Sequence, residues 1–110
     1  MASSSSLTAR VRDALMRQRS ITEKRMFGGV VFLLHGNMLV AIWNGSLIAR
    51  LGVEQATAAM REPHVGPMDL TGKPMKGWVI VAADGVDEDL DLQRWIERAL
   101  HFVQTLEPKG

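Results

Sequence analysis

The sequence predicts an α+β fold, a two-layer sandwich in which helices pack on an antiparallel sheet. Two residue pairs, Gly36-Asn37 and Asn44-Gly45, separate three successive apolar segments, and such pairs accept the positive backbone angles of two-residue hairpin turns. Apolar residues also recur at helical spacing near both ends of the chain. The predicted order is helix, three strands, helix, two strands, helix, which is typical of an α+β domain.

The first predicted helix covers about residues 7–18 and has Ser6 as its N-terminal cap. Its apolar positions recur at helical spacing, at Leu7, Val11, Ala14 and Leu15. Residues 21–27 follow as an extended lead-in to the sheet. Three strands are then expected as a meander, over residues 29–34, 38–43 and 46–51.

The second half of the chain alternates helix and strand signals. Its elements are expected as a short helix over 53–61 that Pro63 stops, strands over 67–70 and 77–83, and a final helix over 88–106. Asp87 can cap the final helix, and Asp89 and Asp91 lie in its first turns, where the helix dipole favours negative charge. The broad apolar stripe of this helix should lie across the sheet.

The strands are more apolar than a sheet with one wet face requires. Residues 30–34, 38–43 and 78–83 form almost unbroken apolar runs, whereas a sheet with one face in water alternates apolar and polar side chains. Either helices or a second copy of the chain must therefore cover the second face. Three helices, one of them short, are too few to cover both faces, so we predict a homodimer built on sheet or edge contacts.

Composition indicates a single soluble, cytoplasmic domain. The chain has 110 residues, of which 46% are hydrophobic and 23% charged, and it contains no cysteine, which excludes disulfides and thiolate sites. The sequence has neither a signal peptide nor a run of about 20 apolar residues that could span a membrane. We expect a disordered tail over residues 1–6, one domain over 7–106 and a short tail over 107–110.

The net charge of +1 is unevenly distributed. Residues 1–25 hold six basic and two acidic side chains, hence +4, whereas the remainder holds seven basic and ten acidic ones, hence −3. The basic segment could contact nucleic acid, form a solvated helix face, or dock on the acidic C-terminal helix of its own or another subunit. The sequence has no base-stacking pattern, so we expect direct nucleic-acid binding to be weak at most.

The sequence offers no catalytic constellation. His35, His64 and His101 are far apart and lack the close spacing that metal ligands favour. No serine lies in a nucleophile-elbow pattern, and the carboxylates over residues 84–91 are explained by helix capping and the helix dipole. We therefore expect neither an enzyme nor a bound cofactor or metal.

Two segments are candidates for binding. Residues 23–29, Glu-Lys-Arg-Met-Phe-Gly-Gly, pass from charged to apolar residues and end in a glycine pair, which indicates a sharp bend or bulge at a strand entrance. The loop over residues 67–78 contains two lysines, two methionines and two prolines. It is either an adaptable binding loop or a rigid connection whose methionines tuck under the core.

Together the two segments are expected to form one basic rim edged by methionines. The candidate interaction residues are Lys24, Arg25, Met26, Phe27, Gly28, Gly29, Lys73, Met75 and Lys76.

The same segments carry a family resemblance. Three motifs carry it and precede a strand and an amphipathic helix. In order along the chain they are Lys24-Arg25-Met26-Phe27-Gly28-Gly29, Gly36-Asn37-Met38 and Gly72-Lys73-Pro74-Met75-Lys76-Gly77. Over residues 7–106 the chain resembles the N-terminal domain of the TfoX/Sxy family, regulators of natural competence. The resemblance implies a two-layer fold similar to type III secretion chaperones and supplies no catalytic residues. Full-length members carry a second, helical domain and act with the cyclic-AMP receptor protein at promoters, whereas this chain is expected to be a single-domain member.

Two functional hypotheses follow. The first is a non-catalytic regulatory module, linked to transcription or competence, that binds a protein such as a component of the transcription machinery. It would use the edge over residues 24–29 and the loop over residues 73–76. The second is a binder of a small anionic molecule, or an enzyme acting on one, that uses the basic rim near Gly28-Gly29.

Overall fold

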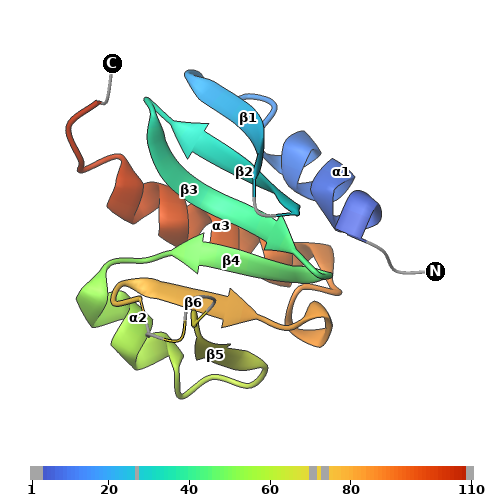
Figure 1. The fold of residues 1–110 in the computed structure, drawn as a ribbon, viewed down its shortest axis with the longest axis vertical. Coiled ribbons are helices and arrows are strands. Elements are labelled where there is room, and N and C mark those ends of the chain that lie inside the picture. Colours follow the sequence, from blue (N-terminus) through green and yellow to red (C-terminus); the bar gives the residue numbers. More distant parts are fainter. Residues whose placement is uncertain (1–3, 27, 70–71, 73–74, 109–110) are drawn as a thin grey trace.

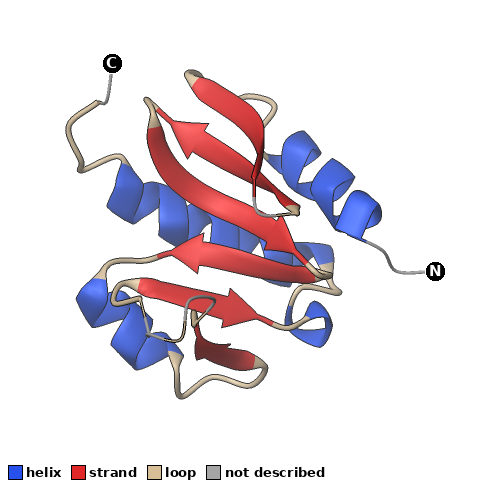
Figure 2. Cartoon of the chain, viewed as in Figure 1, coloured by secondary structure: helices blue, strands red, loops and turns tan. Residues whose placement is uncertain are grey.

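The computed structural model describes residues 4–26, 28–69, 72 and 75–108. Its elements are α1 (Ser4–Ala14), β1 (Ile21–Met26), β2 (Gly29–Leu34), β3 (Asn37–Trp43), β4 (Ser46–Arg50), α2 (Val53–Ala59), β5 (Val65–Pro67), β6 (Trp78–Val81), a 3₁₀ turn (Ala83–Gly85) and α3 (Asp89–Val103). The strands form one open antiparallel sheet in the order β1-β2-β3-β4-β6-β5 (Figure 1). The α+β class and the two-layer arrangement predicted from the sequence are confirmed (Figure 2).

The sheet has six strands where the sequence predicted five. The segment expected as an extended lead-in is the edge strand β1, which pairs with β2 without interruption from Ile21 opposite Leu34 to Met26 opposite Gly29. Its middle residues are charged and exposed, so it lacks the apolar alternation by which strands are identified. An edge strand can keep charged side chains in water because it is not buried in the middle of the sheet. These charges also discourage pairing with a further strand.

Two hairpin turns organise the centre of the sheet. Asn44 and Gly45 have φ of 51° and 80°, so the predicted turn is confirmed. The other turn lies at His35 and Gly36, with φ of 51° and 82°, one residue earlier than predicted. Asn37 belongs instead to β3, where it is buried and its side-chain amide donates a hydrogen bond to the carbonyl oxygen of Glu107 at 2.8 Å.

Helix α1 begins at Ser4, three residues before the predicted start, so Ser6 lies inside the helix and is not its cap. Its Arg10 reaches the start of α3, where the guanidinium donates to the carbonyl oxygens of Val86 and Asp87 at 2.8 and 3.1 Å and to the carboxylate of Asp89 at 3.0 Å. The basic helix therefore docks on the C-terminal helix of its own chain, one of the three roles left open by the sequence.

Two further predictions shift by a few residues. Helix α3 begins at Asp89 and follows Glu88, with no side-chain cap, so Asp87 is not the capping residue. Strand β5 covers Val65–Pro67 instead of residues 67–70, of which residue 70 lies outside the described part of the chain. No described helix has both the length and the apolar character that a membrane crossing requires.

The main core lies on one face of the sheet, and all three helices contribute to it. Val11 from α1, Ala56 from α2 and Ile96 from α3 pack in the same buried cluster as Leu39 and Val40 of β3. Figure 1 shows α3 lying behind the sheet along much of its width. We call this side the helix face, and the opposite side the open face.

A bulge in β3 adds to the helix face. Phe32 lies opposite Val40, whereas Leu33 lies opposite Met38, so Leu39 is an extra residue in the ladder. A bulge lets two neighbouring residues point to the same side, and both Leu39 and Val40 are fully buried in the main core. Beyond the bulge, successive side chains of β3 again point alternately to the helix face and the open face.

The open face is apolar as well. Its buried cluster comprises Val31, Leu33, Ala41, Ile48, Met68 and Trp78. Most of these residues come from strands, and Met68 comes from the start of the segment that joins β5 to β6. This accounts for the unbroken apolar runs: their side chains are apolar on both faces, but the helices of the described residues pack on only one. The predicted homodimer remains a prediction.

Gly29 marks a close approach between β2 and β3. A Cβ atom at this position would overlap the carbonyl oxygen of Ile42, which is backbone and cannot easily move aside. We expect Gly29→Ala to destabilise the fold by about 1–3 kcal/mol, the usual cost of adding a methyl group where there is no space. Urea denaturation followed by circular dichroism measures this change.

The matched control is Gly66→Ala, because Gly66 is also a strand glycine and a Cβ there would meet no atom within 4 Å. Its effect should stay within about 0.5 kcal/mol. Equal destabilisation by the two substitutions would contradict the close approach at Gly29.

Candidate functional site

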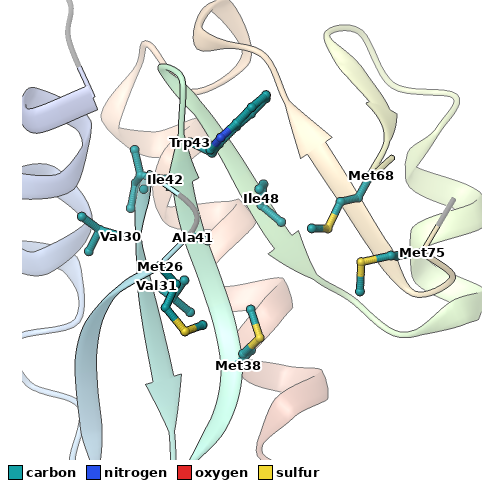
Figure 3. A pocket seen from close by; sticks show the side chains of 11 residues that line it. Met26, Val30, Val31, Met38, Ala41, Ile42, Trp43, Ile48, Met68 and Met75 are labelled. Carbon is teal, nitrogen blue, oxygen red and sulfur yellow. The ribbon is translucent and has the colours of Figure 1, made fainter. Parts of the chain in front are cut away.

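A hollow on the open face is the candidate site. Its volume is about 320 Å³, and it is lined by Met26, Gly29, Val30, Val31, Met38, Ala41, Ile42, Trp43, Ile48, Met68 and Met75. Figure 3 shows Met68 and Met75 on one side of it and Met26 and Met38 on the other. We call this cavity the sheet hollow. None of the described residues that line it carries a charge.

The pairing register explains the floor of the sheet hollow. Val31, Ala41 and Ile48 are direct neighbours across β2, β3 and β4, and paired residues of an antiparallel sheet point to the same face. Ala41 has the smallest side chain of this row, and it lies between the two larger ones. The hollow therefore opens above the middle of β3, where a longer side chain would have filled it.

The loop between β5 and β6 provides the opposite wall. The backbone N–H of Met75 donates to the carbonyl oxygen of Met68 at 2.8 Å, which closes the base of the loop. The carbonyl oxygen of Gly77 accepts hydrogen bonds from the N–H groups of Leu51 and Gly52 at 2.8 and 3.1 Å. These bonds fix the two methionines against the sheet. Met68 is buried, while Met75 is 39% exposed.

Methionine gives this wall an adaptable surface. Four of the seven methionines of the chain line the sheet hollow. The methionine side chain is unbranched and polarisable, so it can repack around apolar groups of different shape, and it is frequent at binding surfaces. Trp43, which is half-buried at the end of β3, adds a large flat surface of the kind that dominates contacts between proteins. The arrangement suits apolar contact.

The predicted interaction residues are divided by the structure. Met26, Gly29 and Met75 line the sheet hollow. Gly28 is exposed, with φ of 76°, in the turn that precedes β2. Lys76 is exposed and contributes to a neighbouring groove beside Trp78. Phe27 and Lys73 lie outside the described residues.

Lys24 and Arg25 point to opposite faces of the sheet. Lys24 pairs with Val31, whose side chain belongs to the open face, whereas Arg25 pairs with Val30, which packs against the main core. The sequence predicted that both cations belong to one basic rim, but their side chains point to opposite faces and do not form it together. Lys24 is the one that lies on the same face as the sheet hollow.

Glu23, at the start of the basic junction, has a structural partner. Its carboxylate accepts two hydrogen bonds from the Arg12 guanidinium, at 2.9 and 2.7 Å, which join β1 to α1. This pairing lowers the pKa of Glu23 and raises the pKa of Arg12, chiefly through the hydrogen bonds themselves. Glu23 thus acts as an anchor on the helix face.

Arg50 was not anticipated by the sequence. Its guanidinium carbon lies 5.3 Å from the ring centre of Trp78 and 6.0 Å from that of Phe102, within the range of cation–π attraction. Met68 belongs to the loop over residues 67–78, which was predicted as a candidate for binding, whereas Met38 and Trp43 were missed as site residues. The unbroken apolar strands were the signal for them, since every second residue of such a strand faces away from the helices.

The described residues do not form a metal site. No three of their histidine, aspartate and glutamate side chains come together in a way that could hold a metal ion. No buried side-chain nitrogen or oxygen atom in the described part lacks a hydrogen-bond partner, so no unsatisfied polar group marks a ligand position. What the site can do chemically is bury apolar surface.

Comparison with known families identifies the chain. The family model described as the TfoX N-terminal domain matches residues 13–103. The chain belongs to the TfoX N-terminal domain family. The match ends at the last residue of α3 and includes every residue that lines the sheet hollow. Comparisons with curated proteins and with solved structures give no match.

Membership in the TfoX N-terminal domain family accords with a regulatory, competence-related module. In this TfoX N-terminal domain the sheet hollow is an apolar surface feature formed by β1, β2, β3, β4 and the base of the β5–β6 loop. The conclusion about function therefore depends on what such a hollow binds.

Proposed function

We propose that this TfoX N-terminal domain is a non-catalytic regulatory module that binds another protein through the sheet hollow, in the regulation of transcription or competence. The observation that carries the proposal is the hollow itself, an apolar cavity with four methionines in its wall on the face that has no helix. Its volume of about 320 Å³ is enough for one or two apolar side chains of a partner. Family membership supports the regulatory setting.

Burial of this surface would favour association. Apolar area removed from water contributes about 25 cal/mol per Å² before the costs of association are subtracted. Met38 and Trp43 are only half-buried in the isolated chain, so they have area left to bury. Apolar and aromatic anchors seated in such hollows supply most of the binding energy at protein interfaces.

The alternative, a small anionic ligand beside Gly28-Gly29, receives less support. Anion sites use backbone N–H groups or cationic side chains that converge on one point. The described wall beside Gly29 is made of apolar side chains, and Arg25 lies on the other face of the sheet. An apolar segment of a protein fits this wall better than a phosphate or a carboxylate.

Nucleic-acid binding is also disfavoured by how the basic residues are used. Arg10 is engaged with the start of α3, and Arg12 is paired with Glu23. Phosphate contacts would have to compete with these ion pairs, and surface contacts of this kind weaken as salt rises. Two of the six basic residues of the N-terminal segment thus have a structural role that does not require a nucleic acid.

A charge placed in the sheet hollow tests the proposal. Met38→Lys puts an ammonium group against the apolar wall, whereas Met16→Lys makes the same change on a methionine that is 73% exposed and outside the hollow. We expect Met38→Lys to weaken binding of a partner captured by the wild-type chain at least tenfold, about 1.4 kcal/mol. Met16→Lys should leave the affinity unchanged.

Affinities are measured by titrating the purified partner against each variant, after circular dichroism has shown that both variants are folded. If Met38→Lys binds every captured partner as tightly as the wild type does, the hollow is not the binding surface and the proposal fails.

We also propose that the chain forms a homodimer through sheet or edge contacts outside the sheet hollow, because the described helices leave the apolar open face without a covering layer. Light scattering of the wild type at tens of micromolar should give twice the mass of one chain. A single-chain mass would contradict the dimer. If the dimer forms and Met38→Lys abolishes it, the hollow binds a second copy and not a different protein.

A further inference from the structure

A second hollow adjoins the first, between α2 and the base of the β5–β6 loop. Its volume is about 350 Å³, and Val53, Met60, Pro67, Met75, Lys76 and Trp78 contribute to its wall. Val53 is 57% exposed and Met60 is 37% exposed. With Met75 they make up three of the five exposed large hydrophobic residues in the described part of the chain. We call this cavity the α2 hollow.

Met75 joins the two hollows. It belongs to the wall of both, and the hydrogen bond from its N–H to Met68 holds its backbone in place. Its side chain is partly exposed, and a methionine side chain can adapt its shape to a bound group. We call the two hollows together the two-part groove, because they share Met75 and extend from Met26 of β1 to Val53 and Met60 at α2.

The groove offers apolar contacts to the side chains of a partner, but its floor offers no free hydrogen-bonding groups to the partner's backbone. Its floor is the interior of a sheet, where β2, β3 and β4 each have a paired strand on both sides, so their backbone groups are already used. A segment that enters must satisfy its own N–H and C=O groups, because an unpaired buried backbone group is costly. A helix meets this condition within itself, whereas an added strand would need a free edge such as β1.

The charges near the groove are mainly positive. Lys76 is the one charged residue among the described residues that line the two hollows. Lys24 shares the open face at one end of the groove, and Arg50, paired with Trp78, shares it at the other. The exposed Asp69 is the carboxylate next to Met68. A partner with acidic residues beside its apolar ones complements this pattern.

We propose that the two-part groove receives an amphipathic helix of the protein partner, with one apolar anchor in each hollow and acidic residues flanking the anchors. Anchors spaced at i and i+7, or i and i+4, lie on one face of a helix and are the usual way in which helices occupy grooves. This inference rests on the proposed function, because it specifies the kind of segment that the module binds.

The methionines of the chain provide the test. The 110-residue chain is labelled with ¹³C at the methionine methyl groups. The probe is a designed helical peptide of about 18 residues, about 27 Å long, with leucine anchors and glutamate flanks. The peptide should shift the Met38 and Met60 signals together, along the same titration curve. Met16 lies outside both hollows and should not move.

Two control peptides separate the parts of the inference. A peptide in which lysines replace the glutamates should bind at least tenfold more weakly, and a peptide with alanine in place of one anchor should lose the shift in only one hollow. Shifts confined to one hollow, equal binding of the lysine peptide, or no shift at up to about 1 mM peptide would each overturn the proposal.

Affinities of substituted chains for the captured partner distinguish failure of the helix-binding inference from failure of the proposed function. Met60→Lys places a charge in the α2 hollow alone, and it should reduce partner affinity about tenfold. If Met38→Lys loses the partner while Met60→Lys keeps it, the module binds through the sheet hollow but not along the two-part groove. If Met38→Lys does not fold, Met26→Lys replaces it, because Met26 lines the same hollow.

Discussion

The main constraint on the described part of this molecule is a sheet that is apolar on both faces but has helices packed on only one. The helix face takes the whole of the large core, with side chains from all three helices packed on Phe32, Leu39 and Val40. The bulge in β3 directs both Leu39 and Val40 to that side. On the open face, the small side chain of Ala41 lies at the centre of a row of larger ones, so the surface is hollowed where a helix or a further layer is missing.

The helix face stabilises the fold, and the open face provides the surface proposed for binding. On the helix face, Arg10 fixes α1 to the start of α3 and Arg12 fixes it to β1, which ties distant parts of the sequence together. On the open face the walls are built from methionines, whose side chains repack at little cost. A rigid scaffold with an adaptable surface is what a small binding module requires, and it explains how one short chain can hold both a packed core and an exposed apolar groove.

The class of fold and most strand positions could be predicted because they depend on local patterns such as the Asn44-Gly45 turn and the apolar runs. The strand β1 could not, since its charged middle residues lack apolar alternation, and the first turn was displaced because Asn37 is held by a contact with Glu107 seventy residues away. For the site, Met26, Gly29 and Met75 were among the predicted interaction residues and all three line the sheet hollow. The hollow itself depends on the register of three strands and on the folded-back base of a loop. Neither is encoded in a local pattern, and the face to which Lys24 or Arg25 points follows from pairing alone.

The central claim is that the methionines of the open face serve binding and contribute little to the stability of the isolated chain. The free energy of unfolding of the double variant Met26→Gln with Met38→Gln, measured in urea, tests it most directly. Both residues are only half-buried, so the account predicts a change within about 1 kcal/mol, as for substitutions away from the core. Leu39→Ala, in the fully buried core, should cost about 2–5 kcal/mol in the same experiment. A loss in the double variant as large as that of Leu39→Ala would show that the open face is part of the core and would contradict the account.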